Sequence, residues 1–291
     1  MKKIFFGLQI LLLTTAWAEP GLDIAGAVDW EKMEIEARVT LDLASAGIRL
    51  PTGRTQGEEL IRAGYSGLIQ PRILSIPVDS SHTVADYVQS GDFSLFQAES
   101  FAWKARLRPP AHSPDLSSLN AAYRLNLEDL AAEFLDPSRP SPPPRIIAPP
   151  PVTDYTGILI IAGEELPLHG TGRSALPLPC LFPKIWDTDM NLVYERNMLD
   201  GGKALMVRYA RRKDIFFPSP SGLSPELSDA VGERPLRILA RGVFGIRPTD
   251  PVIHRDDADL ILSSENNRRL LREGRVTIVL DDQALEDPFG D

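Results

Sequence analysis

Four side chains in the second half of the chain are of types that bind ligands or take part in catalysis: His169, Arg173, Asp187 and Asp189. His169 and Arg173 belong to the segment HGTGRS, which resembles glycine-rich loops that hold phosphates or oxyanions. The third glycine of a dinucleotide fingerprint is absent, and two prolines follow where a helix would have to begin. We therefore expect a surface loop here, with His169 and Arg173 as candidate binding residues.

Asp187 and Asp189 are separated by one residue and would point the same way from a strand. Two such carboxylates can bind a cation or act as a general acid and a general base. The tetrapeptide 188–191, TDMN, is also typical of a hairpin turn, where aspartates bond to their own backbone. The turn is the favoured interpretation, and the carboxylate pair is kept as an alternative.

Known catalytic motifs are missing. The sequence has no His-Glu-x-x-His, no Walker loop, no Gly-x-Ser-x-Gly and no pair of cysteines, and no two of its four histidines lie within a helical turn. We expect no metal site, no cofactor and no enzymatic activity, and a carboxylate-dependent hydrolase is the least favoured function. The single cysteine, Cys180, is expected to be a small buried side chain.

The N-terminus has the pattern of a signal peptide. Two lysines precede a mostly apolar run over 4–13, and Ala16 and Ala18 supply the small residues that a signal peptidase accepts. We expect cleavage before Glu19. The run is shorter than the roughly 20 residues that span a bilayer, and no apolar run of that length follows. The sequence thus predicts export across the inner membrane, a periplasmic or outer-membrane-associated location, and no transmembrane segment in the mature chain.

Charge narrows the range of partners. The formal net charge is −9, and removal of Lys2 and Lys3 with the signal peptide makes it −9 − 2 = −11. This balance argues against nucleic acid as a partner, which requires a basic face, and against adsorption to anionic lipid headgroups.

A proline tract divides the chain. Eight of the sixteen residues over 136–151 are proline, which favours extended polyproline II structure. Fully extended, the tract would reach about 50 Å at roughly 3.1 Å per residue, so we expect a spacer between two folded units. The predicted organisation is a signal peptide over 1–18, a domain over 19–135, the linker over 136–151 and a second domain over 152–291.

Both predicted domains combine helices and strands. In the first, residues 34–43 alternate as a half-buried strand, 55–70 form a helix that Pro71 kinks or ends, and Thr83 with Asp86 forms a capping box. A second alternating strand crosses 121–127, and glycines in the 55–70 helix allow close approach to the sheet. The aromatic and aliphatic core candidates between the capping box and this strand are Phe93, Leu95, Phe96, Phe101 and Trp103.

The second domain has the same mixed character. Strands are predicted over 155–162, 204–209, 236–242 and 275–280, with a hairpin around 188–191, a short helix capped by Ser224 and a long helix over 256–272. Residues 281–291 are expected to be a polar tail. The fold class is therefore α+β: two small α+β domains joined by a proline-rich linker, after a cleaved signal peptide.

Several segments carry a family resemblance. In the first domain these segments are EIEARVTLDL, ILSIPVDSSHTVADYV and AYRLNLEDLAAEFL, and in the second they are YTGILIIA, PCLFPKIWDTDMNLVY, RPLRILARGVFG and RVTIVLD. Together they resemble segments of secreted envelope proteins related to flagellar assembly protein T and its outer-membrane lipoproteins. The lipid-attachment cysteine is missing, so a lipid anchor is not implied. AGEE at 162–165 stands where relatives have a more aspartate-rich turn. The resemblance implies no catalytic residues.

The leading hypothesis is a non-enzymatic secreted protein of the bacterial envelope, a structural or assembly factor, with flagellar association as its more specific form. Envelope or flagellar proteins are the expected partners. The alternative is a periplasmic ligand- or glycan-binding protein, with its site at the domain interface or in the loop over 163–176.

Overall fold

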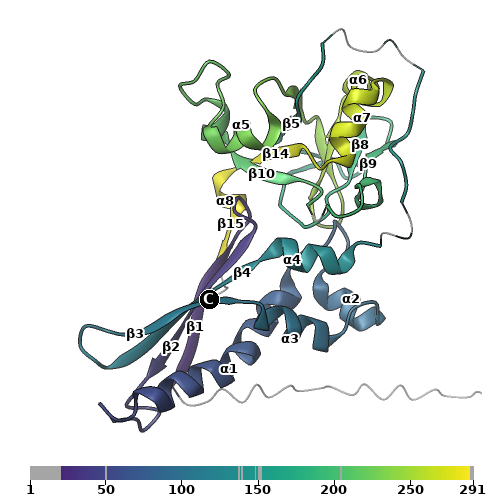
Figure 1. Cartoon of the computed structure of the whole chain (residues 1–291). Helices are drawn as coiled ribbons and strands as arrows, with labels where there is room; N and C mark the ends of the chain where they lie inside the picture. Colours follow the sequence, from purple (N-terminus) through teal and green to yellow (C-terminus); the bar gives the residue numbers. More distant parts are fainter. Residues whose placement is uncertain are drawn as a thin grey trace, which may run out of the picture.

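The computed structural model describes residues 21–49, 51–136, 138, 140–147, 149, 153–203 and 205–288. The predicted signal peptide and its cleavage residues Ala16, Ala18 and Glu19 lie outside these residues. The chain forms two α+β domains, as the sequence predicts, and Figure 1 shows them stacked end to end.

The first domain is an antiparallel sheet with helices on one face. Its strand order is β15-β1-β2-β4-β3. Four of these strands come from the first domain and the fifth from the far end of the chain: β1 (Leu22–Asp29), β2 (Glu34–Asp42), β3 (Arg106–His112), β4 (Ser118–Asn126) and β15 (Glu286–Pro288). The helices are α1 (Arg54–Ser75), α2 (Val84–Ser90), α3 (Leu95–Trp103), α4 (Leu127–Ala131) and the 3-10 turn η1 (Ala132–Phe134).

The alternation in β2 and β4 sorts their side chains onto two faces. Ile35, Ala37, Val39 and Leu41 of β2 are buried under the helices, and the residues between them point away. Helix α1 supplies the other side of this core through a stripe at four-residue spacing, formed by Gly57, Ile61, Tyr65, Ile69 and Ile73. Tyr65 stacks on Tyr123 of β4 with ring centroids 3.6 Å apart.

Helix α1 continues through Pro71 instead of ending there, so residues 73–75 are its last turn. The sequence predicts that the glycines of α1 allow this helix to approach the sheet closely. The structure confirms this for Gly57 and Gly64 but not for Gly67. A Cβ on Gly64 would lie 2.6 Å from Leu22 Cδ1, and one on Gly57 would lie 3.2 Å from Leu119 Cδ2, whereas one on Gly67 would meet nothing within 4 Å. The capping box of Thr83 and Asp86 is confirmed.

The aromatic segment is only partly core. Phe93 and Phe101 are buried, but Leu95, Phe96 and Trp103 are 51%, 76% and 51% exposed. The prediction of core positions was therefore wrong for these three. Helix α3 packs on α1 through Ala98, Phe101 and Ala102, and a single helix buries only one stripe.

The second domain is built around a four-stranded parallel sheet in the order β10-β14-β5-β11. These strands are β5 (Ile158–Ile161), β10 (Arg208–Arg211), β11 (Leu236–Leu239) and β14 (Val276–Leu280). Ile158 and Ile160 face the core that contains α6 (Arg255–Ser263) and α7 (Glu265–Arg272), while Leu159 faces a smaller core with α5 (Pro225–Val231). Parallel strands are typically covered on both faces in this way.

A six-stranded mixed sheet completes the second domain, in the order β7-β6-β12-β13-β8-β9. Its strands are β6 (Leu166–Leu168), β7 (Arg173–Ala175), β8 (Ile185–Asp187), β9 (Leu192–Tyr194), β12 (Gly242–Phe244) and β13 (Asp250–Ile253). Three short elements lie between strands: the 3-10 turns η2 (Arg196–Met198) after β9 and η3 (Arg212–Ile215) after β10, and the helix α8 (Asp282–Leu285) between β14 and β15. The single long helix expected over 256–272 is broken at Ser264, which caps α7 with its side chain.

The two domains are packed directly against each other, so the proline tract does not hold them apart. Leu181 N–H donates to Pro77 O, and Phe182 N–H donates to Val78 O. Trp30, 1% exposed, meets the ring of Tyr209 edge-on at 6.1 Å. Within the described part of the tract Pro143 is buried, and Ile146 packs against the core. The spacer prediction was wrong, because apolar surface on both domains is buried at their contact.

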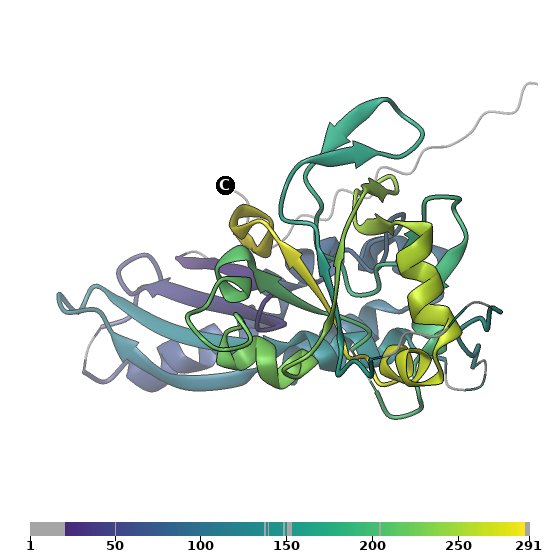
Figure 2. The ribbon, with the colours of Figure 1, turned by 90° about the horizontal axis from the view of Figure 1, so that it is seen from above.

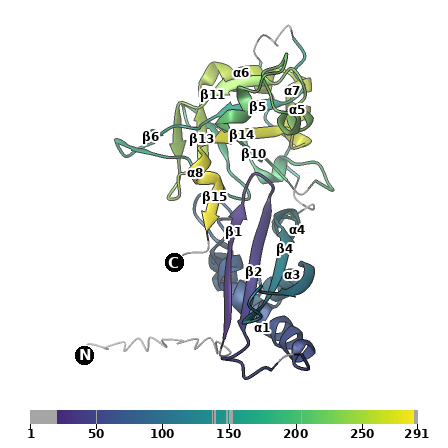
Figure 3. The ribbon, with the colours of Figure 1, turned by 90° about the vertical axis from the view of Figure 1, so that its left-hand side faces the viewer.

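The C-terminal segment is also different from the polar tail that its composition suggests. Residues 282–285 form α8, and β15 pairs antiparallel with β1, matching Asp29 with Glu286 and Ala27 with Pro288. Figure 3 shows β15 descending from the second domain to lie alongside β1. The end of the predicted second domain thus completes the sheet of the first.

Candidate functional site

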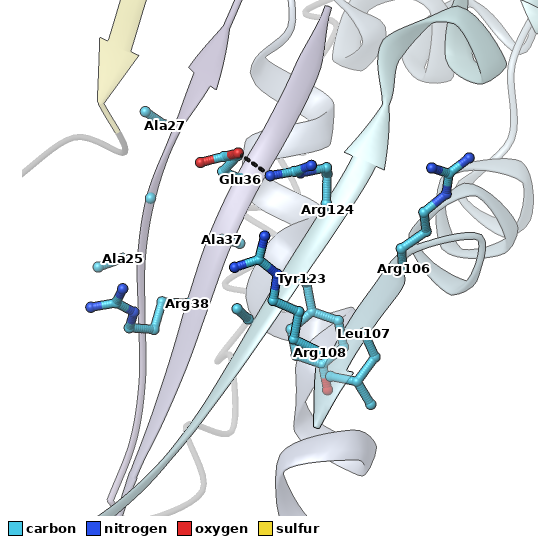
Figure 4. Close-up of a pocket in the computed structure, with 12 residues that line it drawn as sticks. Ala25, Ala27, Glu36, Ala37, Arg38, Arg106, Leu107, Arg108, Tyr123 and Arg124 are labelled. Atoms are coloured by element: carbon cyan, nitrogen blue, oxygen red, sulfur yellow. Dashed lines mark hydrogen bonds and ion pairs between the residues drawn. The ribbon is translucent and has the colours of Figure 1, made fainter. Parts of the chain in front are cut away.

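A concave surface lies on the face of the first sheet that the helices leave uncovered. It is a groove of about 570 Å³ that runs over β1, β2, β4 and β3. Its lining is dominated by alanine and arginine (Figure 4): Ala25, Ala27, Glu36, Arg38, Arg106, Arg108, Ala122 and Arg124.

Strand register explains this shape. Ala25, Arg38, Ala122 and Arg108 form one row across the four strands, and every one of them points to the uncovered face. In the neighbouring row Ala27, Glu36, Arg124 and Arg106 are aligned in the same way. Methyl groups therefore form the floor of the groove, and long cationic side chains rise beside them. We call this surface the arginine groove.

Only one of the four arginines is neutralised. Arg124 pairs with Glu36 at 2.7 Å and with Glu34 at 3.1 Å. No ion pair or hydrogen bond joins the guanidinium groups of Arg38, Arg106 and Arg108 to another residue in the part of the chain that the structure describes. Figure 4 shows Arg108 extended across β4 towards β2, near the Arg124–Glu36 pair. The arginine groove thus offers three free cations on a protein whose net charge is −9.

The two edges of this sheet differ. On one side β15 pairs with Ala27, Val28 and Asp29, the last three residues of β1. On the other, β3 contains Pro109 and Pro110, which have no N–H to donate, and its register shifts between Arg108 and Ala111. Addition of a further strand is disfavoured at such an edge. At β3 it is therefore the face, with its arginines, that is open to a ligand.

The residues singled out from the sequence lie elsewhere and are not brought together. His169 and Arg173 flank the turn of the β6–β7 hairpin, which projects from the second domain in Figure 2. The turn has Gly170 and Gly172 at φ of 77° and 67°. The prediction of a loop is therefore refined to a hairpin, and Arg173 is exposed.

Asp187 and Asp189 occupy the β8–β9 turn, as the favoured interpretation predicts. Asp187 is buried, and its Oδ1 accepts hydrogen bonds from the N–H groups of Asp189 and Asn191 at 2.9 and 2.8 Å. Asp189 is exposed and pairs with Arg255 at 2.7 Å. The two carboxylates thus have separate structural partners. Strand β8 runs antiparallel to β6 with two strands between them, which places His169 and Asp187 at opposite ends of the sheet.

In open parallel sheets, ligands usually bind at the carboxyl ends of the strands. Here the contact with the first domain occupies that edge at β10. Arg211, the last residue of β10, binds Glu31 of the β1–β2 turn and Glu286 of β15, each at 2.7 Å. These carboxylates raise the pKa of the Arg211 guanidinium, which is held as a cation. This position joins the two domains.

Sequence reasoning missed the arginine groove. The alternation of 34–43 puts Arg38 on the polar face of its strand, but no strand is predicted at Arg106 and Arg108. The available signal was the triplet Arg106-Leu107-Arg108, a period-two pattern immediately before two prolines. No signal in the sequence pairs this triplet with the strands that carry Arg38 and Arg124. Cys180 is buried, as predicted.

The structure is that of a two-domain α+β protein, and no helix among its described residues is both long and apolar enough to cross a membrane. Residues 22–133 match the family model of the N-terminal domain of Treponema pallidum Tp0624, and residues 157–282 match the model of its second domain. The chain is therefore similar to two consecutive domains of that protein, and these matches do not support the expected resemblance to flagellar assembly protein T. None of the curated proteins matches the chain.

Proposed function

We propose that this protein is a non-enzymatic binding protein of the bacterial envelope, and that the arginine groove holds an anionic group of its ligand. The observation that carries the proposal is the set of three unpaired guanidinium groups around an alanine floor. Guanidinium groups form strong, charge-assisted hydrogen bonds with carboxylates and phosphates.

Electrostatics supports the same conclusion. Arg106 and Arg124 are direct cross-strand partners, and the carboxylates of Glu34 and Glu36 neutralise Arg124 alone. Arg38, Arg106 and Arg108 have no such partners among the described residues. Their charges are therefore suited to an anionic ligand from outside.

The proposal is tested with citrate, a small multivalent carboxylate, against sodium chloride at equal ionic strength. We expect citrate to raise the free energy of unfolding of the wild type, by about 2.7 kcal/mol at 100 times its dissociation constant. The triple variant R38Q/R106Q/R108Q should lose this stabilisation. Arg62→Gln, which changes an exposed arginine on α1, is the matched control. Equal effects of citrate on the wild type and the triple variant would refute the proposal.

The envelope location rests on the predicted signal peptide. Cell fractionation of the native chain, and of a chain with Ala16 and Ala18 changed to leucine, tests it. We expect the native chain in the periplasm or with the outer membrane and the double variant held as an uncleaved precursor.

A structural or assembly role is a second candidate, favoured by the exposed side of α3. Leu95, Phe96 and Trp103 expose large apolar side chains on one short helix, and such surfaces often mark contacts with other proteins. Flagellar association is its more specific form, and motility of a deletion strain tests that form directly. A deletion strain with normal motility would remove the flagellar role and leave the binding proposal untouched.

A further inference from the structure

The spacing of the free arginines indicates what kind of anion the arginine groove takes. Arg106 and Arg108 are two residues apart on β3 and on the same face, so their Cα atoms lie about 6.8 Å apart. Arg38 occupies the same row as Arg108 with β4 between them, at about 9.6 Å for two strand spacings. Three cations distributed in this way match several anionic groups along a chain better than one compact anion.

An extended polypeptide repeats its side chains with the same period as β3. Carboxylates at positions i and i+2 of such a segment point to one side and are about 6.8 Å apart. Figure 4 shows the Arg108 side chain extended across β4 and the Arg106 side chain directed away from β4, and both residues are exposed. Acidic residues on alternate positions would therefore draw these two guanidinium groups to one segment, with Arg38 in the same row as Arg108. The alanine floor gives the segment room to lie close to the sheet.

The charge density of the groove argues against more highly charged polymers. Duplex nucleic acid has one phosphate for about every 1.7 Å of axis, and a protein that binds it needs a broad basic face. Here three free arginines lie on a chain with a net charge of −9. Strand pairing beside Arg106 and Arg108 is also disfavoured, because β3 contains Pro109 and Pro110.

We infer that the arginine groove binds an extended acidic segment of a partner protein, with carboxylates on alternate residues. This inference rests on the proposed anion-binding function and specifies its ligand. The segment lies on the face of the sheet, is held by side chains, and adds no strand to either edge.

Two fluorescent decapeptides of identical composition, each with four glutamates and six serines, test the inference by anisotropy. In one the glutamates alternate with serine, and in the other they are consecutive. We expect the alternating peptide to bind the full chain at least tenfold more tightly. The double variant R106Q/R108Q should lose that preference and most of the affinity, R106K/R108K should retain part of it, and the control R62Q should bind like the wild type.

The outcomes separate the two proposals. If citrate stabilises the protein but both peptides bind equally, the ligand inference fails and the anion-binding function stands. Tighter binding of inorganic polyphosphate or of a single-stranded oligonucleotide than of the alternating peptide also overturns the inference. If neither citrate nor any peptide binds, both proposals fail. Circular dichroism of each variant confirms that loss of binding is not loss of folding.

Discussion

Arg106 on β3 lies directly opposite Arg124 on β4. Their side chains share the uncovered face of the sheet, and only Arg124 has carboxylate partners, Glu34 and Glu36. The arrangement places a cation beside an already paired cation, next to a floor of alanines. It links the stability of the first domain to the occupancy of its groove.

Replacing Arg106 with glutamine should therefore weaken ligand binding and change the free energy of unfolding of the free protein by less than about 0.5 kcal/mol. Arg106 is exposed, and its cross-strand neighbour Arg124 is already paired with Glu34 and Glu36. Urea unfolding measures the stability, with Arg62→Gln as the control. A strongly destabilised R106Q protein would contradict the account.

Trp30 should be the main apolar contact that couples the two domains. Its side chain is buried and packs edge-on against Tyr209, while its backbone N–H donates to Leu285 O. Truncation to alanine should cost about 3–5 kcal/mol, as for other buried aromatic side chains. We expect calorimetry to show two separate transitions in place of one.

Trp103→Ala provides the matched control, since Trp103 is half exposed on α3. Its effect should stay within about 0.5 kcal/mol. Similar losses for the two tryptophans would show that Trp30 has no special role at the domain contact.

A chain that ends at Leu285 should have a weakened first domain. The truncation removes β15 from the edge of β1 and removes the 2.7 Å contact between Glu286 and Arg211. We expect a loss of about 2 kcal/mol, the net value of a few hydrogen bonds. Hydrogen exchange at the amides of β1 should become faster, because that edge becomes accessible to water.

The variant Glu286→Gln of the untruncated chain distinguishes the contribution of β15 to stability from that of the ion pair between Glu286 and Arg211. It retains β15 and loses only the charge, so its effect should be below about 1 kcal/mol. Unchanged exchange at β1 after truncation would mean that β15 does not protect this edge in solution.

Asp250 should make the protein less stable as the pH rises. It is fully buried and accepts hydrogen bonds from Lys184 N–H and the Trp186 indole at 3.1 and 3.4 Å, yet burial raises its pKa above the ordinary value of 3.8. The folded state then binds the proton more tightly than the unfolded chain. The contribution of Asp250 is most favourable below the unfolded pKa and is lost as the pH rises through the folded pKa.

Urea midpoints of the wild type and Asp250→Asn between about pH 4 and pH 7 test this sign. The difference between wild type and variant should decline with rising pH, by about 1.4 kcal/mol for each unit by which the pKa is raised. Asp115→Asn gives the opposite case. Hydrogen bonds from Ser113 and Ser117 lower the pKa of Asp115 to about 2, so its contribution is present above its ordinary pKa and lost as the pH falls towards 2.

Local structure was largely readable from the sequence where a short-range pattern decides it. The alternation of 34–43, the capping box of Thr83 and Asp86 and the turn chemistry of Asp187 all appear as expected, because each depends on neighbours within four residues. The α+β class follows from the same patterns.

Tertiary structure decided what those patterns could not. Apolar composition alone placed Leu95, Phe96 and Trp103 in the core, whereas packing on α1 buries only the other side of α3. The proline tract was expected to separate the domains, but their apolar surfaces meet around Trp30 and Tyr209. A polar C-terminal segment became β15, because β1 offered an open edge of unpaired backbone groups.

The arginine groove shows the same division. The alternation of 34–43 and 121–127 by itself determined that Arg38 and Arg124 lie on the polar faces of two strands, since side chains alternate along a strand with a period of two. It did not determine that these strands are neighbours, or that Arg106 and Arg108 belong to a third strand beside them. The pairing of β2 with β4 and of β4 with β3, with the opposite face buried under α1, brings the four arginines to one surface.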